Sequence, residues 1–182
     1  MPTSEQDLEY PAPSPAPTGQ VMVVHAVTNS YWMPDRVNDD DTNDRDELQN
    51  FTADPLWNNA AVLWRFTRLQ NGSYRISSAN GTKHVTRVGE AARNTPVRLH
   101  PKDDGAASQH WDLVPVPGLA DTPGRAPVRA IVARGTSYAI GMVDNVLSND
   151  AEMRLIRMWN NQPTIYHGWT LIPAPSAEEE AE

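Results

Sequence analysis

Two Trp-Asn-Asn triplets stand about a hundred residues apart in the chain. A tryptophan ring offers a flat apolar face for stacking on a ligand, and an asparagine amide both donates and accepts hydrogen bonds. Plainer interpretations remain open, because the rings can pack beneath a loop or contact another protein, and asparagine readily forms turns. The six residues are Trp57, Asn58, Asn59, Trp159, Asn160 and Asn161. The duplication indicates either repeated units or chance.

The residue types that usually carry catalysis or bind metals form no recognisable motif. The sequence has no HExxH, no G-X-S-X-G and no Gly-rich phosphate loop before a helix. It has no cysteine, and its five histidines lack close ligand spacing. The acidic run 38–47 fails the calcium-loop template, since Asp44 and Asn50 stand where glycine and glutamate are needed. We therefore expect a solvated acidic loop, no metal, no cofactor and no enzymatic activity.

Composition narrows the partners and the compartment. The chain has 182 residues and a net charge of −8, without the basic stripe that nucleic-acid binding requires. No apolar run approaches the length that spans a membrane. The first residues lack the basic and apolar regions of a signal peptide. Together with the absence of cysteine, this favours a cytoplasmic protein that binds neither nucleic acid nor membranes.

The elements that would position the triplets are short strands. Residues 1–19 and 175–182 have the composition of flexible tails, which leaves a folded domain over 20–174. Between the tails, apolar and alternating runs recur with Pro and Gly between them, and Asn71-Gly72 predicts a tight hairpin. Only residues 44–49 allow a helical turn or two. This pattern predicts an all-β barrel or sandwich.

Three similar segments reveal an internal repeat. Trp64-Arg-Phe-Thr, Trp111-Asp-Leu-Val and Trp169-Thr-Leu-Ile recur at spacings of 47 and 58 residues. They predict three units, at about 20–69, 70–117 and 126–174. Three large aromatic side chains from equivalent strands can meet near a threefold axis. We therefore expect these three tryptophans in the core, which separates Trp64 from Trp57.

The second unit carries the fullest signature, ending in Gln109-His110-Trp111 after Tyr-X-Ile, a glycine turn and Pro-Val-X-Leu. This combination resembles the ricin-B-type β-trefoil family, and in particular its fungal branch, whose three repeats each end in Gln-X-Trp. The other two units read Val62-Leu63-Trp64 and His167-Gly168-Trp169, so their glutamine is replaced. The resemblance covers the chain from about residue 21 to 174. It implies a β-trefoil of about twelve strands.

The resemblance also implies shallow sugar pockets, built from an aspartate, a stacking aromatic residue and an asparagine. In the second repeat the aspartate position falls near Val85, the aromatic position near 100–102 and the asparagine position at Ser108, so we expect no site there. The first repeat offers Trp57, Asn58 and Asn59, and the third offers Trp159, Asn160 and Asn161. Asp35 and Asp144 are the nearest acids, without clean alignment. We predict a glycan- or glycoprotein-binding lectin with at most two sites.

A trefoil protease inhibitor of the mycocypin kind is the alternative that the resemblance leaves open. Such inhibitors insert a long exposed loop into a protease, and the segment after the first predicted strand is long. Its candidate anchors are Tyr31, Trp32 and Met33, since aromatic residues are enriched at binding hot spots. The opposite expectation is that these side chains pack down as part of the barrel cap.

Overall fold

The computed structural model describes residues 16–34, 48–51, 62–79, 81–103, 105–119, 123–142, 151–160 and 162–174. Within these ranges the chain forms twelve strands and two short 3-10 segments, η3 (Ala107–Gln109) and η5 (Ile165–His167). No helix in the described part is long and apolar enough to cross a membrane. The all-β prediction is confirmed.

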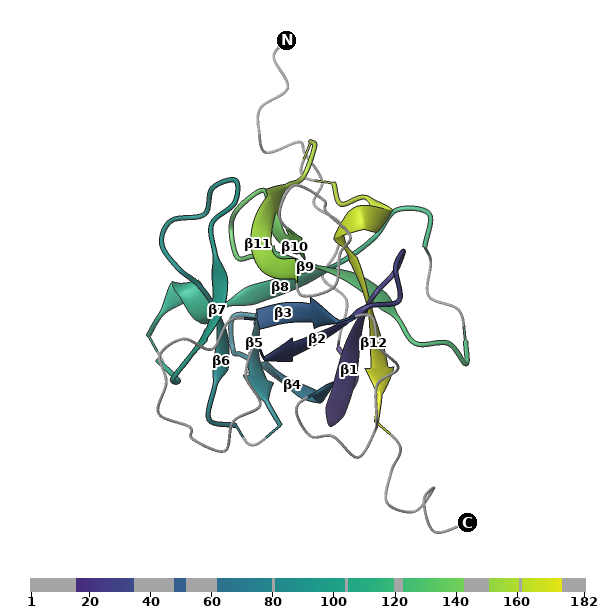
Figure 1. Cartoon of the computed structure of the whole chain (residues 1–182), viewed down its shortest axis with the longest axis horizontal. Helices are drawn as coiled ribbons and strands as arrows, with labels where there is room; N and C mark the ends of the chain where they lie inside the picture. Colours follow the sequence, from purple (N-terminus) through teal and green to yellow (C-terminus); the bar gives the residue numbers. More distant parts are fainter. Residues whose placement is uncertain are drawn as a thin grey trace.

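The strands fall into three successive sets of four (Figure 1). The first set is β1 (Gln20–His25), β2 (Tyr31–Pro34), β3 (Leu48–Phe51) and β4 (Trp64–Arg68). The second is β5 (Tyr74–Ser78), β6 (His84–Arg87), β7 (Val97–His100) and β8 (Trp111–Pro115). The third is β9 (Val128–Ala133), β10 (Tyr138–Met142), β11 (Ala151–Arg157) and β12 (Gly168–Pro173).

The first and fourth strands of each set close a barrel. Around it the antiparallel neighbours run β1, β4, β5, β8, β9, β12 and back to β1. Figure 1 shows β1 and β12 side by side, so the first and last strands of the trefoil are neighbours in the barrel. The middle strands of each set pair as hairpins, β2 with β3, β6 with β7 and β10 with β11. This is the β-trefoil arrangement.

Three fully buried tryptophans hold the three sets together. The indole Nε1 of Trp111 donates to the carbonyl of Val85 at 2.9 Å, and that of Trp169 donates to Ile140 at 3.0 Å. The indole of Trp64 makes the corresponding, longer bond to the carbonyl of Trp32 at 3.4 Å. The predicted core role of these tryptophans is confirmed. Each of these three rings thus has a partner for its polar N–H, as buried indoles usually do.

The Asn71-Gly72 turn forms as its sequence indicates. Gly72 has a φ of 86°, and the Asn71 side-chain oxygen accepts from the backbone N–H of Ser73 at 2.9 Å. The turn sets the register of β4 against β5, in which Trp64 faces Ser78. On β4 the tryptophan and Phe66 are buried while Arg65 is exposed, which is the alternation expected from the sequence.

Two local expectations differ from the structure. Residues 48 and 49 belong to β3, not to a helical turn, because they pair with β2 and β11. Leu48 is fully buried, so tertiary burial outweighs the local sequence pattern there. The end of the predicted N-terminal tail also contacts the barrel, since the backbone N–H of Ala16 donates to the Tyr74 hydroxyl at 3.1 Å.

Candidate functional site

The glutamine of the second repeat holds a loop against the barrel. The Nε2 of Gln109 donates to the carbonyl of Pro101 at 2.9 Å and to the hydroxyl of Thr86 at 3.2 Å. Its Oε1 accepts from the backbone N–H of Asp103 at 3.0 Å. The side chain is buried, so each of these groups would lose its partner if the amide were removed. The Gln-X-Trp glutamine is therefore a structural residue here.

In the third repeat His167 takes the place of that glutamine. Its Nδ1 accepts from the backbone N–H of Thr164 at 2.9 Å, and the Thr164 hydroxyl lies 3.1 Å away. Burial lowers the pKa of His167, against the raising effect of hydrogen bonds with the backbone of Arg157 and Thr164. A neutral imidazole thus performs the task of an amide. The sequence shows histidine in place of the glutamine, at the same offset before Trp169, but its hydrogen-bonding role required the structure.

The segment between β11 and β12, residues 158–167, carries most of the exposed apolar surface. In the described part of the chain, the exposed large hydrophobic residues are Val27, Val88, Trp159, Ile165 and Tyr166. Three of these five lie on this segment, which we name the third-repeat connection. Trp159 is 74% exposed, Tyr166 50% and Ile165 42%. Solvent-facing aromatic side chains gathered on one connection indicate a binding surface.

The third-repeat connection is fixed at both ends. Its first backbone N–H, at Met158, donates to the carbonyl of Ser137 in the β9–β10 hairpin at 2.8 Å. At the other end His25 lies 3.1 Å, through Nε2, from the carbonyl of Tyr166, and its Nδ1 accepts from Val27 N–H at 3.3 Å. Only the Nε2-protonated neutral form satisfies both bonds, which agrees with the pKa of His25 being lowered by burial.

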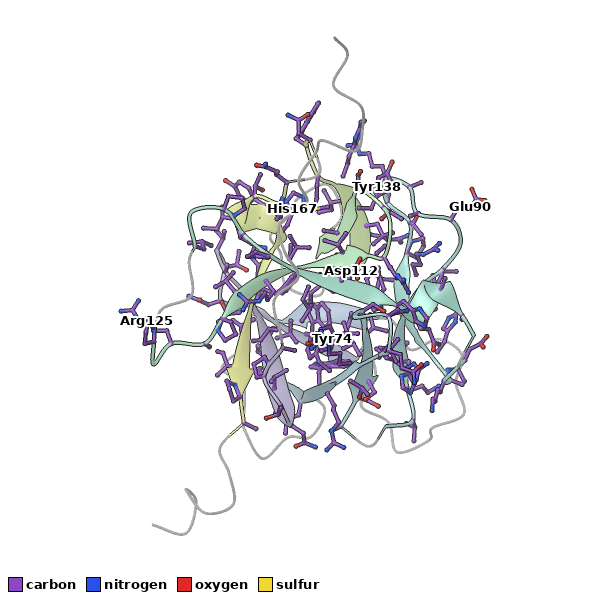
Figure 2. The ribbon with its side chains drawn as sticks, turned by 180° about the vertical axis from the view of Figure 1, so that it is seen from behind. Tyr74, Glu90, Asp112, Arg125, Tyr138 and His167 are labelled. Atoms are coloured by element: carbon purple, nitrogen blue, oxygen red, sulfur yellow. The ribbon has the colours of Figure 1, made fainter. Side chains whose placement is uncertain are left out.

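Figure 2 shows the elements around this end of the molecule, with His167 on η5 and Tyr138 on β10. The two elements pack against each other, as η3 packs against β6 in the second repeat. The exposed rings therefore project from a rigid frame instead of a loose loop. A rigid aromatic surface loses little entropy when a ligand binds.

Trp159 itself stands at the start of a tight turn. The backbone N–H of Gln162 donates to the Trp159 carbonyl at 2.9 Å, and Asn160 occupies the left-handed region with a φ of 51°. Asn160 is thus a turn residue, the plainer of its two expected roles. The guanidinium carbon of Arg157 lies 5.7 Å from the centroid of the Trp159 ring, within cation–π range. Asn161 lies outside the described residues.

The hairpin residues that face the core tryptophans are not aspartates. The tryptophan hydrogen bonds make Trp32, Val85 and Ile140 equivalent, and all three are buried. The residues that follow them are Met33, Thr86 and Gly141. A Cβ added to Gly141 would overlap the end of the Ile156 side chain, so an aliphatic group fills this place in the third repeat. Asp35 and Asp144 lie outside the described residues.

Two of the three proposed inhibitor anchors, Tyr31 and Trp32, are buried. Trp32 is 0% exposed, with its ring edge-on to Trp64 at 5.9 Å and to Trp169 at 5.3 Å. Tyr31 is 5% exposed in a cluster with Val62 and Leu63 and neighbouring residues. The expectation that these two residues are exposed anchors is therefore wrong: they belong to the barrel cap. Met33 is in β2, with its side chain outside the described residues.

Other predicted positions divide between the described and the undescribed parts. Trp57, Asn58 and Asn59, and the acidic run 38–47, lie outside the described residues. In the second repeat the β7–β8 connection has no exposed large hydrophobic side chain among its described residues. No group of three His, Asp or Glu side chains suited to a metal ion occurs in the part of the chain that the structure describes.

Comparison with known proteins identifies the fold. No protein-family model and no curated protein matches the sequence. Among solved structures, the designed threefold-symmetric protein ThreeFoil matches with a TM-score of 0.66 and 15% identity, covering 85% of this chain and 98% of that chain. A Macrolepiota procera ricin B-like lectin in complex with lactose matches with a TM-score of 0.60 and 11% identity, covering 87% and 99%. The chain has a β-trefoil fold.

The same trefoil also occurs within larger proteins. An exo-β-1,3-galactanase from Clostridium thermocellum matches with a TM-score of 0.65 and 12% identity, covering 90% of this chain but 31% of that chain. The trefoil is therefore a fold shared by stand-alone lectins and by parts of glycoside-cleaving enzymes. At these identities the matches establish the fold, and function has to be argued from the side chains.

Proposed function

We propose that this trefoil is a non-catalytic carbohydrate-binding protein whose third repeat binds a glycan on the third-repeat connection. The observation that carries the proposal is Trp159, 74% exposed on a connection that is hydrogen-bonded at both ends. A sugar ring has an apolar C–H face that stacks on an indole, and hydroxyls that need polar partners. Tyr166 supplies a second exposed ring on the same connection.

The first repeat completes the proposal as a second site of the same kind. Its triplet Trp57, Asn58 and Asn59 repeats the residue types of the third repeat, and Asp144 remains the nearest acid for the third site. Single shallow pockets bind weakly, so two sites on one chain would raise the avidity for a multivalent glycoprotein. The second repeat, whose connection is held down by Gln109 and lacks an exposed aromatic side chain among its described residues, has no part in binding.

A glycan array followed by titration calorimetry tests the proposal. We expect Trp159→Ala to lower affinity for the best array ligand by at least about tenfold, which corresponds to roughly 1.4 kcal/mol. Trp159→Phe should recover part of the loss, since an aromatic face remains. Unchanged binding in Trp159→Ala contradicts the site assignment, and a wild-type chain that binds no glycan contradicts the function.

A further inference from the structure

Arg157 and Trp159 form a pair with both members at the surface. Arg157 ends β11, and its guanidinium carbon lies 5.7 Å from the Trp159 ring centroid. The tryptophan keeps 74% of its surface exposed, so the guanidinium leaves most of the ring accessible. A ligand stacked on this ring therefore meets a fixed positive charge within a few ångströms. That charge prefers an anionic group on the ligand.

The described acidic side chains lie elsewhere. Glu90, Asp103 and Asp112 all belong to the second repeat. Glu152 is in β11, with its side chain outside the described residues. None of the three carboxylates of the second repeat is on β11 or on the third-repeat connection, where Arg157 and Trp159 lie.

An aliphatic side chain lies on the third-repeat hairpin. Ile156 lies over Gly141, the residue that corresponds to Thr86 of the second repeat. An aliphatic wall cannot accept hydrogen bonds from a neutral sugar, whose hydroxyls would be left without partners. An anionic sugar needs fewer such acceptors, because its own charged oxygens accept bonds from a guanidinium, in a strong charge-assisted pair.

We propose that the sugar bound at the third repeat is acidic, with its carboxylate or sulfate ester paired to Arg157 while its ring stacks on Trp159. This inference rests on the proposed glycan function and adds the chemical class of the ligand. The planar guanidinium suits both kinds of anionic group, since it can donate two parallel hydrogen bonds.

Titrations of the full-length chain with matched sugar pairs test the inference at low ionic strength. The pairs are methyl β-glucuronide with methyl β-glucoside, and galactose 6-sulfate with galactose. We expect one or both acidic members to bind at least about tenfold more tightly than the neutral partner. The sugar pair that shows this preference identifies the anionic group as a carboxylate or a sulfate ester. Added salt should weaken that member most, because the pair is partly exposed.

Two arginine variants make the result specific. Arg157→Gln should abolish the preference for the acidic sugar, and Arg157→Lys should keep part of it, because the charge remains while the planar fork is lost. The matched control is Arg125→Gln, an identical change of charge on an exposed loop between β8 and β9, at the tip of a projection in Figure 2. It should leave the preference unchanged.

The outcomes separate the two proposals. Equal binding of the acidic and neutral members, a preference that survives Arg157→Gln, or an equal loss in Arg125→Gln overturns the acidic-sugar inference. In each of these cases the glycan function stands if Trp159→Ala removes binding. If neither the pairs nor any array glycan binds the wild-type chain, the proposed function itself fails.

Discussion

The second and third repeats solve the same structural problem but expose different surfaces. Both bury a tryptophan whose indole N–H bonds to the facing hairpin, at 2.9 Å in one and 3.0 Å in the other. Both fix the segment before that tryptophan with one buried polar side chain, Gln109 or His167. Only the third presents exposed aromatic rings there. The two repeats thus share the same buried framework, and binding depends on which side chains the connection before the tryptophan exposes.

The largest expected effect separates the core tryptophans from the surface one. Trp111→Ala should lower the free energy of unfolding by about 3–5 kcal/mol, because it empties a fully buried site and leaves the Val85 carbonyl without its donor. Trp159→Ala should change it by no more than about 0.5 kcal/mol, as is usual for exposed positions. Urea denaturation measures both. Comparable losses of stability in the two variants would place Trp159 in the core and contradict the distinction between core and surface tryptophans.

The next effect concerns the polar side chain that fixes each connection. Gln109→Ala should cost about 1–3 kcal/mol, since the backbone N–H of Asp103 and the carbonyl of Pro101 lose their partner. Gln109→His should recover part of this loss, because a neutral imidazole serves the third repeat in the same position. Urea denaturation of the two variants gives the comparison. If the histidine is no better than alanine, the two repeats do not share this device.

The second and third repeats should also differ, by a smaller amount, in how their contribution to stability depends on pH. The pKa of His167 is lowered in the folded chain, chiefly by burial, so protonation favours the unfolded chain, in which the pKa is near 6.5. Stability is complete above about 6.5 and declines as the pH falls below that value. His25 and His110, whose pKa values burial also lowers, act in the same direction.

Replacing the histidine isolates its share of the pH dependence. His167→Gln should fold normally at pH 7.5 and lose less stability than the wild type between pH 6.5 and 5, because the amide does not titrate. Melting temperatures across this range provide the measurement, with Gln109→His as the reciprocal variant that should lose more. Identical slopes for wild type and His167→Gln would show that His167 contributes nothing to acid sensitivity.

Local sequence signals predicted much of the frame. The Asn71-Gly72 pair predicted its hairpin, and the alternation from Trp64 predicted its strand, because both patterns depend on neighbours along the chain. The recurring tryptophans predicted the core. The sequence left both a surface and a core position open for Trp32, because its burial depends on contacts with Trp64 and Trp169, which are distant in sequence. Residue type and spacing do not reveal such long-range packing.

The candidate site was predictable in part. The exposed position of Trp159 follows from its place outside the core set, but the role of Asn160 as a turn residue required its backbone geometry. The hydrogen-bonding role of His167 and the position of Ile156 over Gly141 needed the structure, because both depend on how the loops and hairpins lie in space. These are contacts between different elements, and a motif search along the sequence does not reveal them.

Indole NMR signals test the central claim most directly, because each tryptophan contributes one Nε1–H resonance and the chain has six. The ligand is the tightest glycan from the array, added to the full-length chain, with resonances assigned by single substitutions. The account predicts that the Trp159 signal shifts on titration while the Trp111 signal stays in place. A shift of Trp111 with an unmoved Trp159 would contradict the account, since binding would then occur at the second repeat.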